Sequence, residues 1–240
     1  MQRKYTHLFF DLDNTLWDFK TNSKIAMKSA FRLLKLDNGD VSFEEFYAAY
    51  SRHNKDLWDA YRKNQVKKKE LTFQRFQFTF DDLNISGIDA NKMNELYLHE
   101  MPKQNQLVDG TLELLNILKT KNYKLFIITN GFKEVQYKKL QSSGLESYFT
   151  KVFISEEVRT PKPSREIFEY ALKSANAKKS RSLMIGDDWE VDVLGALRFG
   201  MDAVHYQAFW QADGNKHKPL ERTPEGAFRV VNIKDIAELL

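Results

Sequence analysis

Several short apolar runs in this sequence are followed by polar residues that could bind a metal ion or a phosphate group. Asp11 and Asp13 follow one such run, and Asp187 and Asp188 follow another. Residues two positions apart on an extended chain point the same way, so the carboxylates of Asp11 and Asp13 should lie close enough to repel each other. A divalent cation would offset this repulsion. Because there is no cysteine and no histidine pair nearby, the expected ligands are oxygens, which favour Mg²⁺ over zinc.

Cationic and hydroxyl donors, which a phosphate group needs, occur at two further positions. Thr129 and Asn130 follow the apolar run 124–128, and Lys162 precedes a segment with helical spacing. A lysine ammonium and a threonine hydroxyl can both donate hydrogen bonds to phosphoryl oxygens. We therefore expect one site that combines carboxylates, a hydroxyl and an ammonium group.

Each of these fragments also has an ordinary explanation. The Thr-Asn-Gly sequence that ends at Gly131 could be a turn, Lys162 could be a surface lysine between two prolines, and Gly-Asp-Asp could cap a helix. Asp-Leu-Asp-Asn could begin a calcium loop of the EF-hand type, but that loop needs glycine at its sixth position, where this chain has Leu16. The order of the fragments along the chain favours a shared site.

The apolar runs alternate with segments of helical spacing, which indicates an α/β fold. Strands are expected at 5–10, 124–128, 152–154 and 182–185, with weaker ones at 203–206 and 228–231, and helices at 111–121, 132–143, 163–175 and 190–199. This alternation predicts a Rossmann-like parallel sheet with helices on both faces. Active sites of open parallel sheets lie outside the carboxyl ends of the strands, where most of the polar residues fall.

A helical segment interrupts this pattern between about residues 22 and 101. Ser42-Phe-Glu-Glu45 is a capping-box pattern in front of a long amphipathic helix. Asp89 can cap a later helix that Pro102 stops. The alternate phenylalanines from 76 to 80 fit a helix, but they would also fit a strand.

The composition excludes some classes of protein. The 37 basic and 33 acidic residues give a net charge of +4, and the densest basic run, the lysines at 67–69, is typical of a solvated turn, so we expect no nucleic-acid partner. The absence of cysteine excludes disulfides and a cysteine nucleophile. No apolar run resembles a signal segment or could span a membrane, so we expect a cytoplasmic location and no membrane partner. Monomer and homodimer both stay open.

Four motifs, in this order, resemble those of the haloacid dehalogenase superfamily. They are Asp11-Leu-Asp-Asn-Thr15, Thr129-Asn-Gly131, Lys162-Pro163 and Gly186-Asp-Asp-Trp-Glu-Val-Asp192. The match covers essentially the whole chain, and the sequences Asp-Asn-Thr-Leu-Trp-Asp-Phe and Thr-Asn-Gly-Phe resemble the pyrimidine 5′-nucleotidase branch. One departure is Ser164-Arg165, where relatives often carry Asp-Pro.

The resemblance implies a two-domain organisation. Residues 1–18 and 104–240 would form the Rossmann-like catalytic core, and residues 19–103 would form an inserted helical cap that determines substrate specificity. Trp17 and Phe19 lie close to the junction and are candidates for stacking on a nucleotide base, although most aromatic residues at helical spacing pack in a core.

The resemblance also implies catalytic roles. Asp11 would attack phosphorus, and Asp13 would protonate the leaving oxygen and then activate water. Thr129 and Lys162 would hold the phosphoryl oxygens. Mg²⁺ would be bound by Asp11, by Asp187 and by the backbone carbonyl of Asp13.

Neighbouring residues receive supporting roles from the same resemblance. Asn130 would order the Asp11 loop, and Asn130 and Gly131 would belong to the substrate-binding turn. Asp192 would orient the metal shell or Lys162. Asp188 is ambiguous between metal binding and such support.

The expected function is a Mg²⁺-dependent phosphatase for small phosphate monoesters, with nucleoside 5′-monophosphates as the expected substrates. A sugar-phosphate phosphatase is the first alternative, followed by a phosphoglucomutase and a 2-haloacid dehalogenase. A halide leaving group needs no acid, so Asp13 favours phosphate. A phosphonate hydrolase would need a Schiff-base lysine in the cap, for which Lys24, Lys28 and Lys55 are available. A phosphorylatable receiver is about half this length, and a non-catalytic binding protein would not need the whole set of catalytic residues.

Overall fold

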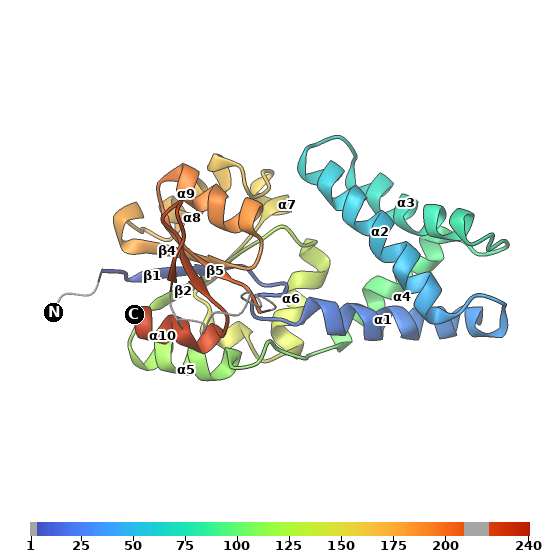
Figure 1. The fold of residues 1–240 in the computed structure, drawn as a ribbon, viewed down its shortest axis with the longest axis horizontal. Helices are drawn as coiled ribbons and strands as arrows, with labels where there is room; N and C mark the ends of the chain where they lie inside the picture. Colours follow the sequence, from blue (N-terminus) through green and yellow to red (C-terminus); the bar gives the residue numbers. More distant parts are fainter. Residues whose placement is uncertain (1–3, 209–220) are drawn as a thin grey trace. The chain divides into compact units, whose positions relative to one another are not determined.

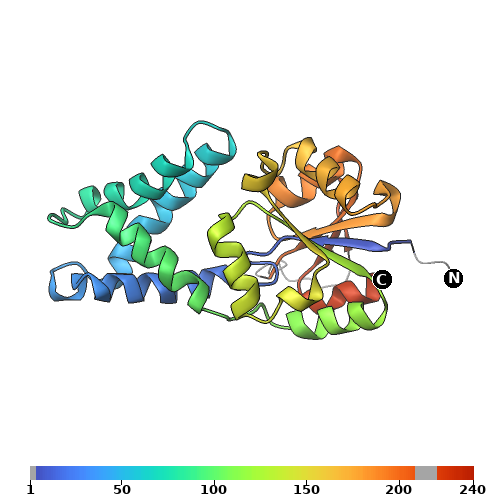
Figure 2. The ribbon, with the colours of Figure 1, turned by 180° about the vertical axis from the view of Figure 1, so that it is seen from behind.

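The computed structural model describes residues 4–208 and 221–240. The chain divides into two compact units, Met1–Phe19 with Gln106–Leu240, here called the core unit, and Lys20–Asn105, here called the helical unit. Figures 1 and 2 show the ribbon from opposite sides. The assignment of these units as catalytic core and specificity cap stays a prediction.

The core unit is built on one sheet with the strand order β3-β2-β1-β4-β5-β7-β6. The strands are β1 His7–Phe10, β2 Lys124–Thr129, β3 Lys151–Ile154, β4 Ser182–Gly186, β5 Asp202–Tyr206, β6 Glu221–Arg222 and β7 Phe228–Val230. β6 pairs antiparallel with β7, and all the other pairings are parallel. The predicted α/β fold with a parallel sheet is confirmed, and β6 is an addition that the sequence pattern did not indicate.

Helices cover both faces of this sheet (Figures 1 and 2). α8 (Arg165–Ser174) and α9 (Leu194–Phe199) lie on one face, and α5 (Thr111–Thr120) and α10 (Ile236–Leu239) lie on the other. Phe9 of β1 packs in the cluster beneath α8 and α9, and its ring centroid lies 4.9 Å from that of Phe126. Burial of such side chains on both sides is the reason that the strands read as nearly continuous apolar runs.

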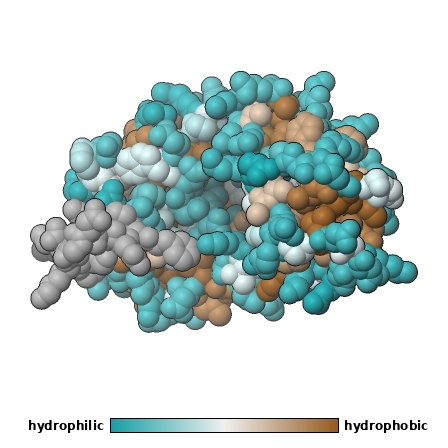
Figure 3. All heavy atoms as spheres, turned by 45° about the vertical axis from the view of Figure 1, so that its right-hand side comes forward, coloured by the Kyte–Doolittle hydropathy of each residue, from teal (hydrophilic) through white to brown (hydrophobic). Residues whose placement is uncertain are grey.

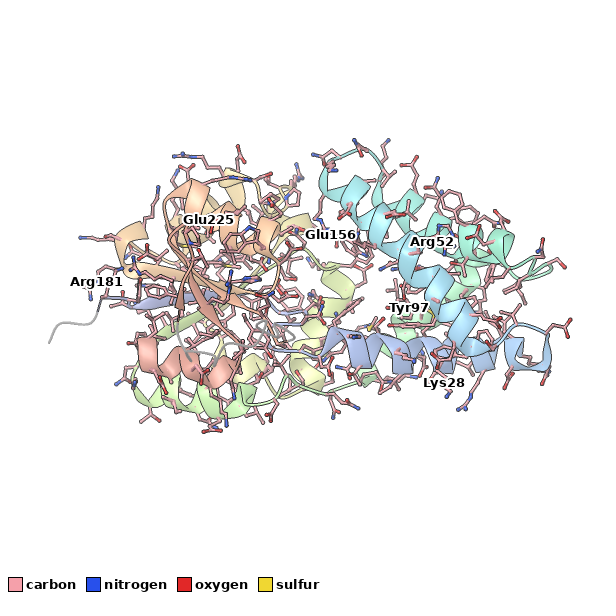
Figure 4. All side chains as sticks on the ribbon, in the orientation of Figure 1. Lys28, Arg52, Tyr97, Glu156, Arg181 and Glu225 are labelled. Atoms are coloured by element: carbon pink, nitrogen blue, oxygen red, sulfur yellow. The ribbon has the colours of Figure 1, made fainter. Side chains whose placement is uncertain are left out.

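Two helices of the core unit bear on the site, and the first of them differs from the prediction. The helix expected at 190–199 consists of a π-helical turn, Trp189–Val193, followed by α9. α6 (Lys133–Ser142) follows β2 and has no side-chain cap of its own. Instead, the backbone N–H of Lys133 donates to the carboxylate of Glu156 at 2.8 Å, and Glu156 comes from the short helix α7 (Ser155–Val158) (Figure 4).

The helical unit contains α2 (Phe43–Arg62), α3 (Lys68–Asp82), α4 (Ala90–Glu100) and most of α1 (Phe19–Leu33). Both hydrogen bonds of the capping box at Ser42 are present, and Asp89 caps α4 as predicted. α3 begins at Lys68, so the solvated turn expected at the lysine run is wrong, because these residues start a helix. The strand alternative for residues 76–80 is also wrong, since they lie within α3.

The interior of the helical unit is aromatic and contains one buried cation. The ring centroid of Tyr50 lies 5.7 Å from that of Tyr97, whose hydroxyl is 2.8 Å from that of Ser23 (Figure 4). Arg75 is buried beside them and donates to the side-chain oxygen of Asn94 at 2.6 Å. Hydrogen bonds to amide oxygens and contact with ring faces offset the cost of burying this guanidinium.

Within the core unit, the segment that leaves for the helical unit is bonded to the segment that returns. The N–H of Asp18 donates to the carbonyl of Gln106 at 3.0 Å, and the N–H of Val108 donates to the carbonyl of Leu16 at 2.9 Å. A bridge between Trp17 and Leu107 joins the same two segments. The two ends of the helical insertion are therefore fixed as neighbours.

No helix in the described ranges is both long enough and apolar enough to cross a membrane. On the face drawn in Figure 3, apolar side chains form separate patches among polar ones.

Candidate active site

The strand order brings the predicted polar residues to one edge of the sheet. β1 lies between β2 and β4, and Phe10 is in register with Ile127 and Ile185. Thr129 is the last residue of β2, and Asp11 and Asp187 directly follow β1 and β4. Three adjacent strands therefore present their polar residues at the same carboxyl-terminal edge, as the sequence predicted.

Lys162 is buried between two carboxylates at this edge. Its ammonium lies 2.6 Å from Oδ1 of Asp11 and 2.6 Å from Oδ1 of Asp192. Burial alone would lower the pKa of this ammonium, but the two carboxylates raise it above its ordinary value of 10.5. Lys162 therefore carries a permanent positive charge against Asp11.

Asn130 fixes the backbone of Lys162 and not that of the Asp11 loop. The N–H of Lys162 donates to Oδ1 of Asn130 at 2.8 Å, and Nδ2 of Asn130 donates back to the carbonyl of Lys162 at 2.9 Å. The expectation that Asn130 orders the Asp11 loop is corrected accordingly, because its amide is used on both sides by the lysine.

Three carboxylates gather around this ion pair. Asp11, Asp187 and Asp192 each offer one oxygen, and the three oxygens lie within 4.8 Å of one another. Burial and the neighbouring carboxylates raise the pKa of Asp11 to about 7, against the opposing effect of Lys162, and raise that of Asp187 to about 8. The Thr15 hydroxyl lies 3.4 Å from Asp11 and 3.3 Å from Asp187, and its single hydrogen can be donated to only one of them.

Charge and donor type at this cluster fit a divalent cation. Four carboxylates, those of the cluster and that of Asp13, share the edge with the ammonium groups of Lys162 and Lys139. When all four carboxyl groups are ionised, their charges exceed those of the ammonium groups by two. A hard cation with oxygen ligands, such as Mg²⁺, would offset the burial and the repulsion that raise the carboxyl pKa values.

Asp188 does not join the cluster. Its Oδ1 accepts hydrogen bonds from the backbone N–H groups of Glu190 and Val191 at 3.1 and 3.0 Å, so it caps the π-helical turn. That turn carries Asp192 to Lys162. His205, which the sequence did not single out, lies with Nε2 3.0 Å from the backbone carbonyl of Asp187 and donates to it, since a carbonyl can only accept.

Asp13 is held by two residues of α6 that sequence reasoning missed. Nζ of Lys139 lies 2.7 Å from Oδ1 of Asp13, and Nε2 of Gln136 donates to Oδ2 at 3.0 Å. The same Gln136 amide donates to the Thr129 hydroxyl at 2.7 Å. The available signal was the spacing: residues three apart on a helix share a face, and this helix directly follows the Thr-Asn-Gly turn.

Comparison with known proteins gives the family. Residues 5–200 match the haloacid dehalogenase-like hydrolases. The chain belongs to this haloacid dehalogenase-like hydrolase family. It is 36% identical over 199 residues to the pyrimidine 5′-nucleotidase YjjG of Escherichia coli (strain K12), covering 82% of this chain and 84% of that protein. It is 33% identical to the pyrimidine 5′-nucleotidase PynA of Streptococcus pneumoniae, covering 84% of each chain.

A solved structure shows the same fold. The magnesium-bound HAD-hydrolase YfnB of Bacillus subtilis superposes with a TM-score of 0.85 over 99% of both chains, at 24% sequence identity. The predictions of an enzyme, of the hydrolase class and of this superfamily are confirmed.

Two glycines of the haloacid dehalogenase-like motifs leave room for site side chains. A Cβ at Gly131 would stand 2.3 Å from the Gln136 amide nitrogen, and a Cβ at Gly186 would stand 2.3 Å from a carboxylate oxygen of Asp192. No real Cβ comes this close to another heavy atom, so both positions need glycine for Gln136 and Asp192 to reach the site. Gly131 was predicted to bind substrate; its contact here is with a site residue.

Trp17 is not placed to stack on a nucleotide base in this hydrolase. It is fully buried, and the Lys139 ammonium lies 4.2 Å from its ring centroid. Phe19 is half-buried, with its ring 5.2 Å from the same ammonium. The two rings surround Lys139, so Trp17 is corrected from a base-stacking candidate to a packing residue of this edge. Substrate contact by Phe19 stays a prediction.

The raised carboxyl pKa values predict how Mg²⁺ will stabilise this hydrolase. A carboxyl whose pKa rises from 3.8 to about 7 or 8 on folding stabilises the fold at low pH and loses that contribution as the pH passes the folded value. The metal-free protein should therefore lose thermal stability between about pH 6 and about pH 8.5. Mg²⁺ should offset this loss, so the rise in Tm that Mg²⁺ causes should be larger at the higher pH.

Thermal unfolding with Mg²⁺ and with a chelator, at both pH values, checks this expectation. In Asp187→Asn, which lacks one titrating ligand, the gain and its pH dependence should both shrink. An equal gain in Tm at the two pH values would contradict the assignment of these carboxyls as the metal ligands.

Proposed function

We propose that this hydrolase is a Mg²⁺-dependent phosphatase that cleaves small phosphate monoesters through an aspartyl-phosphate on Asp11. The observation that carries the proposal is the Lys162 ammonium, held 2.6 Å from Asp11 at an edge that Thr129 and Asp13 also share. A carboxylate nucleophile beside a fixed cation and a hydroxyl donor suits an incoming phosphoryl group, whose negative charge needs compensation near the attacking oxygen.

In the first step an Asp11 carboxylate oxygen attacks phosphorus. A P–O bond to Asp11 forms while the P–O bond to the leaving alcohol breaks, and Asp13 gives its proton to the leaving oxygen. Thr129 and Lys162 donate to the non-bridging phosphoryl oxygens and stabilise the charge of the transition state. The alcohol leaves neutral, and Asp13 is left ionised.

In the second step water attacks the phosphorus of the aspartyl-phosphate. Asp13 takes a proton from that water, the P–O bond to Asp11 breaks, and inorganic phosphate leaves. Asp13 is thereby protonated again for the next cycle. One carboxyl group therefore serves as acid and then as base.

Asp11 and Asp187, with the backbone carbonyl of Asp13, would hold the Mg²⁺, and Asp192 would hold Lys162. When bound, the metal supplies positive charge for the phosphoryl oxygens and keeps the carboxylate of Asp11 ionised. The magnesium in the YfnB structure supports this proposal.

Cleavage of a carbon–halogen bond on the same fold is the main rival chemistry. A halide leaves without a proton, so a dehalogenase would have no use for an acid at position 13. Here Asp13 contacts two buried residues that fix both of its oxygens. That arrangement favours an ester whose leaving oxygen must be protonated.

The proposed substrates are nucleoside 5′-monophosphates, especially those with pyrimidine bases. The support is the similarity to YjjG and PynA, both named as pyrimidine 5′-nucleotidases, over more than four-fifths of this chain. The helical unit would contribute the specificity, since the carboxylate edge of the core unit recognises only the phosphate that all candidates share. A sugar-phosphate phosphatase is the second candidate.

Asp11→Asn tests the nucleophile. The amide keeps the shape of the carboxylate but cannot attack phosphorus, so kcat for UMP should fall by about 10³-fold or more. Asp13→Asn should lower kcat by about 10²–10⁴-fold, the usual contribution of proton transfer. Steady-state phosphate release measures both, with the exposed Asp37→Asn in the helical unit as the matched control at normal activity. Near-normal turnover by Asp11→Asn would exclude the proposed mechanism.

A substrate comparison tests the nucleotide preference. UMP and dTMP should be hydrolysed with kcat/KM about ten- to a hundredfold above ribose 5-phosphate and glucose 6-phosphate, because contact with a base contributes about 1–3 kcal/mol where bases stack on protein side chains. The measurement is phosphate release at equal subsaturating concentrations. Equal kcat/KM for the nucleotides and the sugar phosphates would show that the base is not recognised. The second candidate, a sugar-phosphate phosphatase, would then be favoured.

A further inference from the structure

One face of α6 holds Asp13 by both of its carboxylate oxygens. Lys139 lies 2.7 Å from Oδ1, and Gln136 lies 3.0 Å from Oδ2. Both side chains are buried, with 2% of Lys139 and none of Gln136 exposed. A surface carboxylate would exchange such partners with water, whereas Asp13 is given two protein donors from a single rigid helix.

The burial of Lys139 indicates that its ammonium interacts with Asp13 and not with solvent. Removing an ammonium from water is costly unless an anion or a ring face replaces the water. Here Asp13 is the carboxylate that lies within ion-pair distance among the described residues, and the rings of Trp17 and Phe19 lie 4.2 and 5.2 Å from the ammonium. The neighbouring Lys138 on the same helix is exposed.

Gln136 connects Asp13 to the hydroxyl that would hold the phosphoryl group. Its amide nitrogen lies 3.0 Å from Oδ2 of Asp13 and 2.7 Å from the Thr129 hydroxyl. The spacing between the two groups is therefore set by one amide. The lack of a Cβ at Gly131 makes room for it.

We infer that Lys139 and Gln136 are positioning residues that fix the orientation of the Asp13 carboxyl group toward the leaving oxygen. This inference rests on the proposed acid–base role of Asp13. Each oxygen of Asp13 accepts a hydrogen bond from one of the two residues, at 2.7 Å from Lys139 and 3.0 Å from Gln136, so the plane of the carboxyl group is fixed. Each oxygen also keeps a lone pair that is free for the proton in transit.

In this arrangement the proton moves from the Asp13 carboxyl group to the leaving oxygen as the P–O bond breaks, and it returns to that carboxyl group from the attacking water. Lys139 and Gln136 keep their own protons throughout. Their loss would therefore leave attack by Asp11 possible but would slow those reactions that depend on protonation of the leaving group.

A leaving-group comparison tests the inference. p-Nitrophenyl phosphate releases a stable phenolate that needs little protonation, whereas UMP releases an alkoxide that needs a proton. Lys139→Met should lower kcat/KM for UMP by about 10- to 100-fold, the effect of a misplaced catalytic group, and lower that for p-nitrophenyl phosphate only a few-fold. Lys139→Arg should keep most of the kcat/KM for UMP. Lys138→Met, the matched control, should leave kcat/KM unchanged for both substrates.

Gln136→Met supplies a second variant with a different buried group removed. This variant also loses the contact to Thr129, so kcat/KM should fall for both substrates. The ratio of kcat/KM for UMP to that for p-nitrophenyl phosphate should still fall. Circular dichroism and the rise in Tm caused by Mg²⁺ should be compared among the purified variants to show that each is folded. A general folding defect would lower kcat/KM for both substrates by the same factor. An unchanged ratio in a folded Lys139→Met or Gln136→Met would overturn the inference.

Asp13→Asn, measured in parallel, separates this inference from the proposed function. If Asp13→Asn loses UMP activity selectively and the Lys139 and Gln136 variants do not, the acid–base role stands and the positioning role is wrong. If Asp13→Asn lowers kcat/KM equally for both substrates, the proposed acid role in the first step fails, and the positioning role fails with it.

Discussion

The arrangement of this edge depends on one buried cation, the Lys162 ammonium between Asp11 and Asp192. An unpaired ammonium in this position would be too costly to keep, and loss of one partner of a buried ion pair costs about 3–5 kcal/mol. The surrounding structure meets this demand: Asn130 fixes the lysine backbone, the π-helical turn carries Asp192 inward, and Gly186 leaves space for its carboxylate. Asp11, the proposed nucleophile, is thus placed by the same contacts that offset the cost of burying the lysine.

The parallel sheet turns residues far apart in sequence into neighbours. Asp11 and Thr129 are separated by the whole helical unit, yet β1 and β2 pair in parallel, with Phe10 in register with Ile127, so both residues lie at the same end of the sheet. β4 on the other side of β1 brings Asp187 to the same edge. Because β1 pairs with a parallel strand on each side and the N–H of Asp11 donates to the carbonyl of Ile185 at 2.8 Å, Asp11 is held in place relative to both neighbours. The carboxylates are therefore held close despite their repulsion, and a divalent cation is the natural counter-charge.

The sequence predicted the strands, the principal helices and the residues at the strand ends, because each of these is marked by a local pattern. Asp11, Thr129, Lys162 and Asp187 each lie beside a clear apolar run or a proline. Lys139 and Gln136 lack such a mark, since a charged residue on a helix usually faces water and only the packing of α6 shows that this one does not. Asn130 and Trp17 were given the wrong emphasis for the same reason, because a motif places a residue at a site without showing which partner its side chain meets.

The bonded junction between Leu16–Asp18 and Gln106–Val108 has a consequence for how such proteins can change. The two cut points of the helical insertion are already adjacent, and the core does not need the inserted residues to keep them so. A short turn could replace residues 20–105, or a different helical module could be grafted there, without disturbing β1 or the carboxylate edge. In the proposed division of roles, hydrolytic chemistry and substrate choice then belong to separately exchangeable stretches of chain, so one could diverge in evolution while the other is kept.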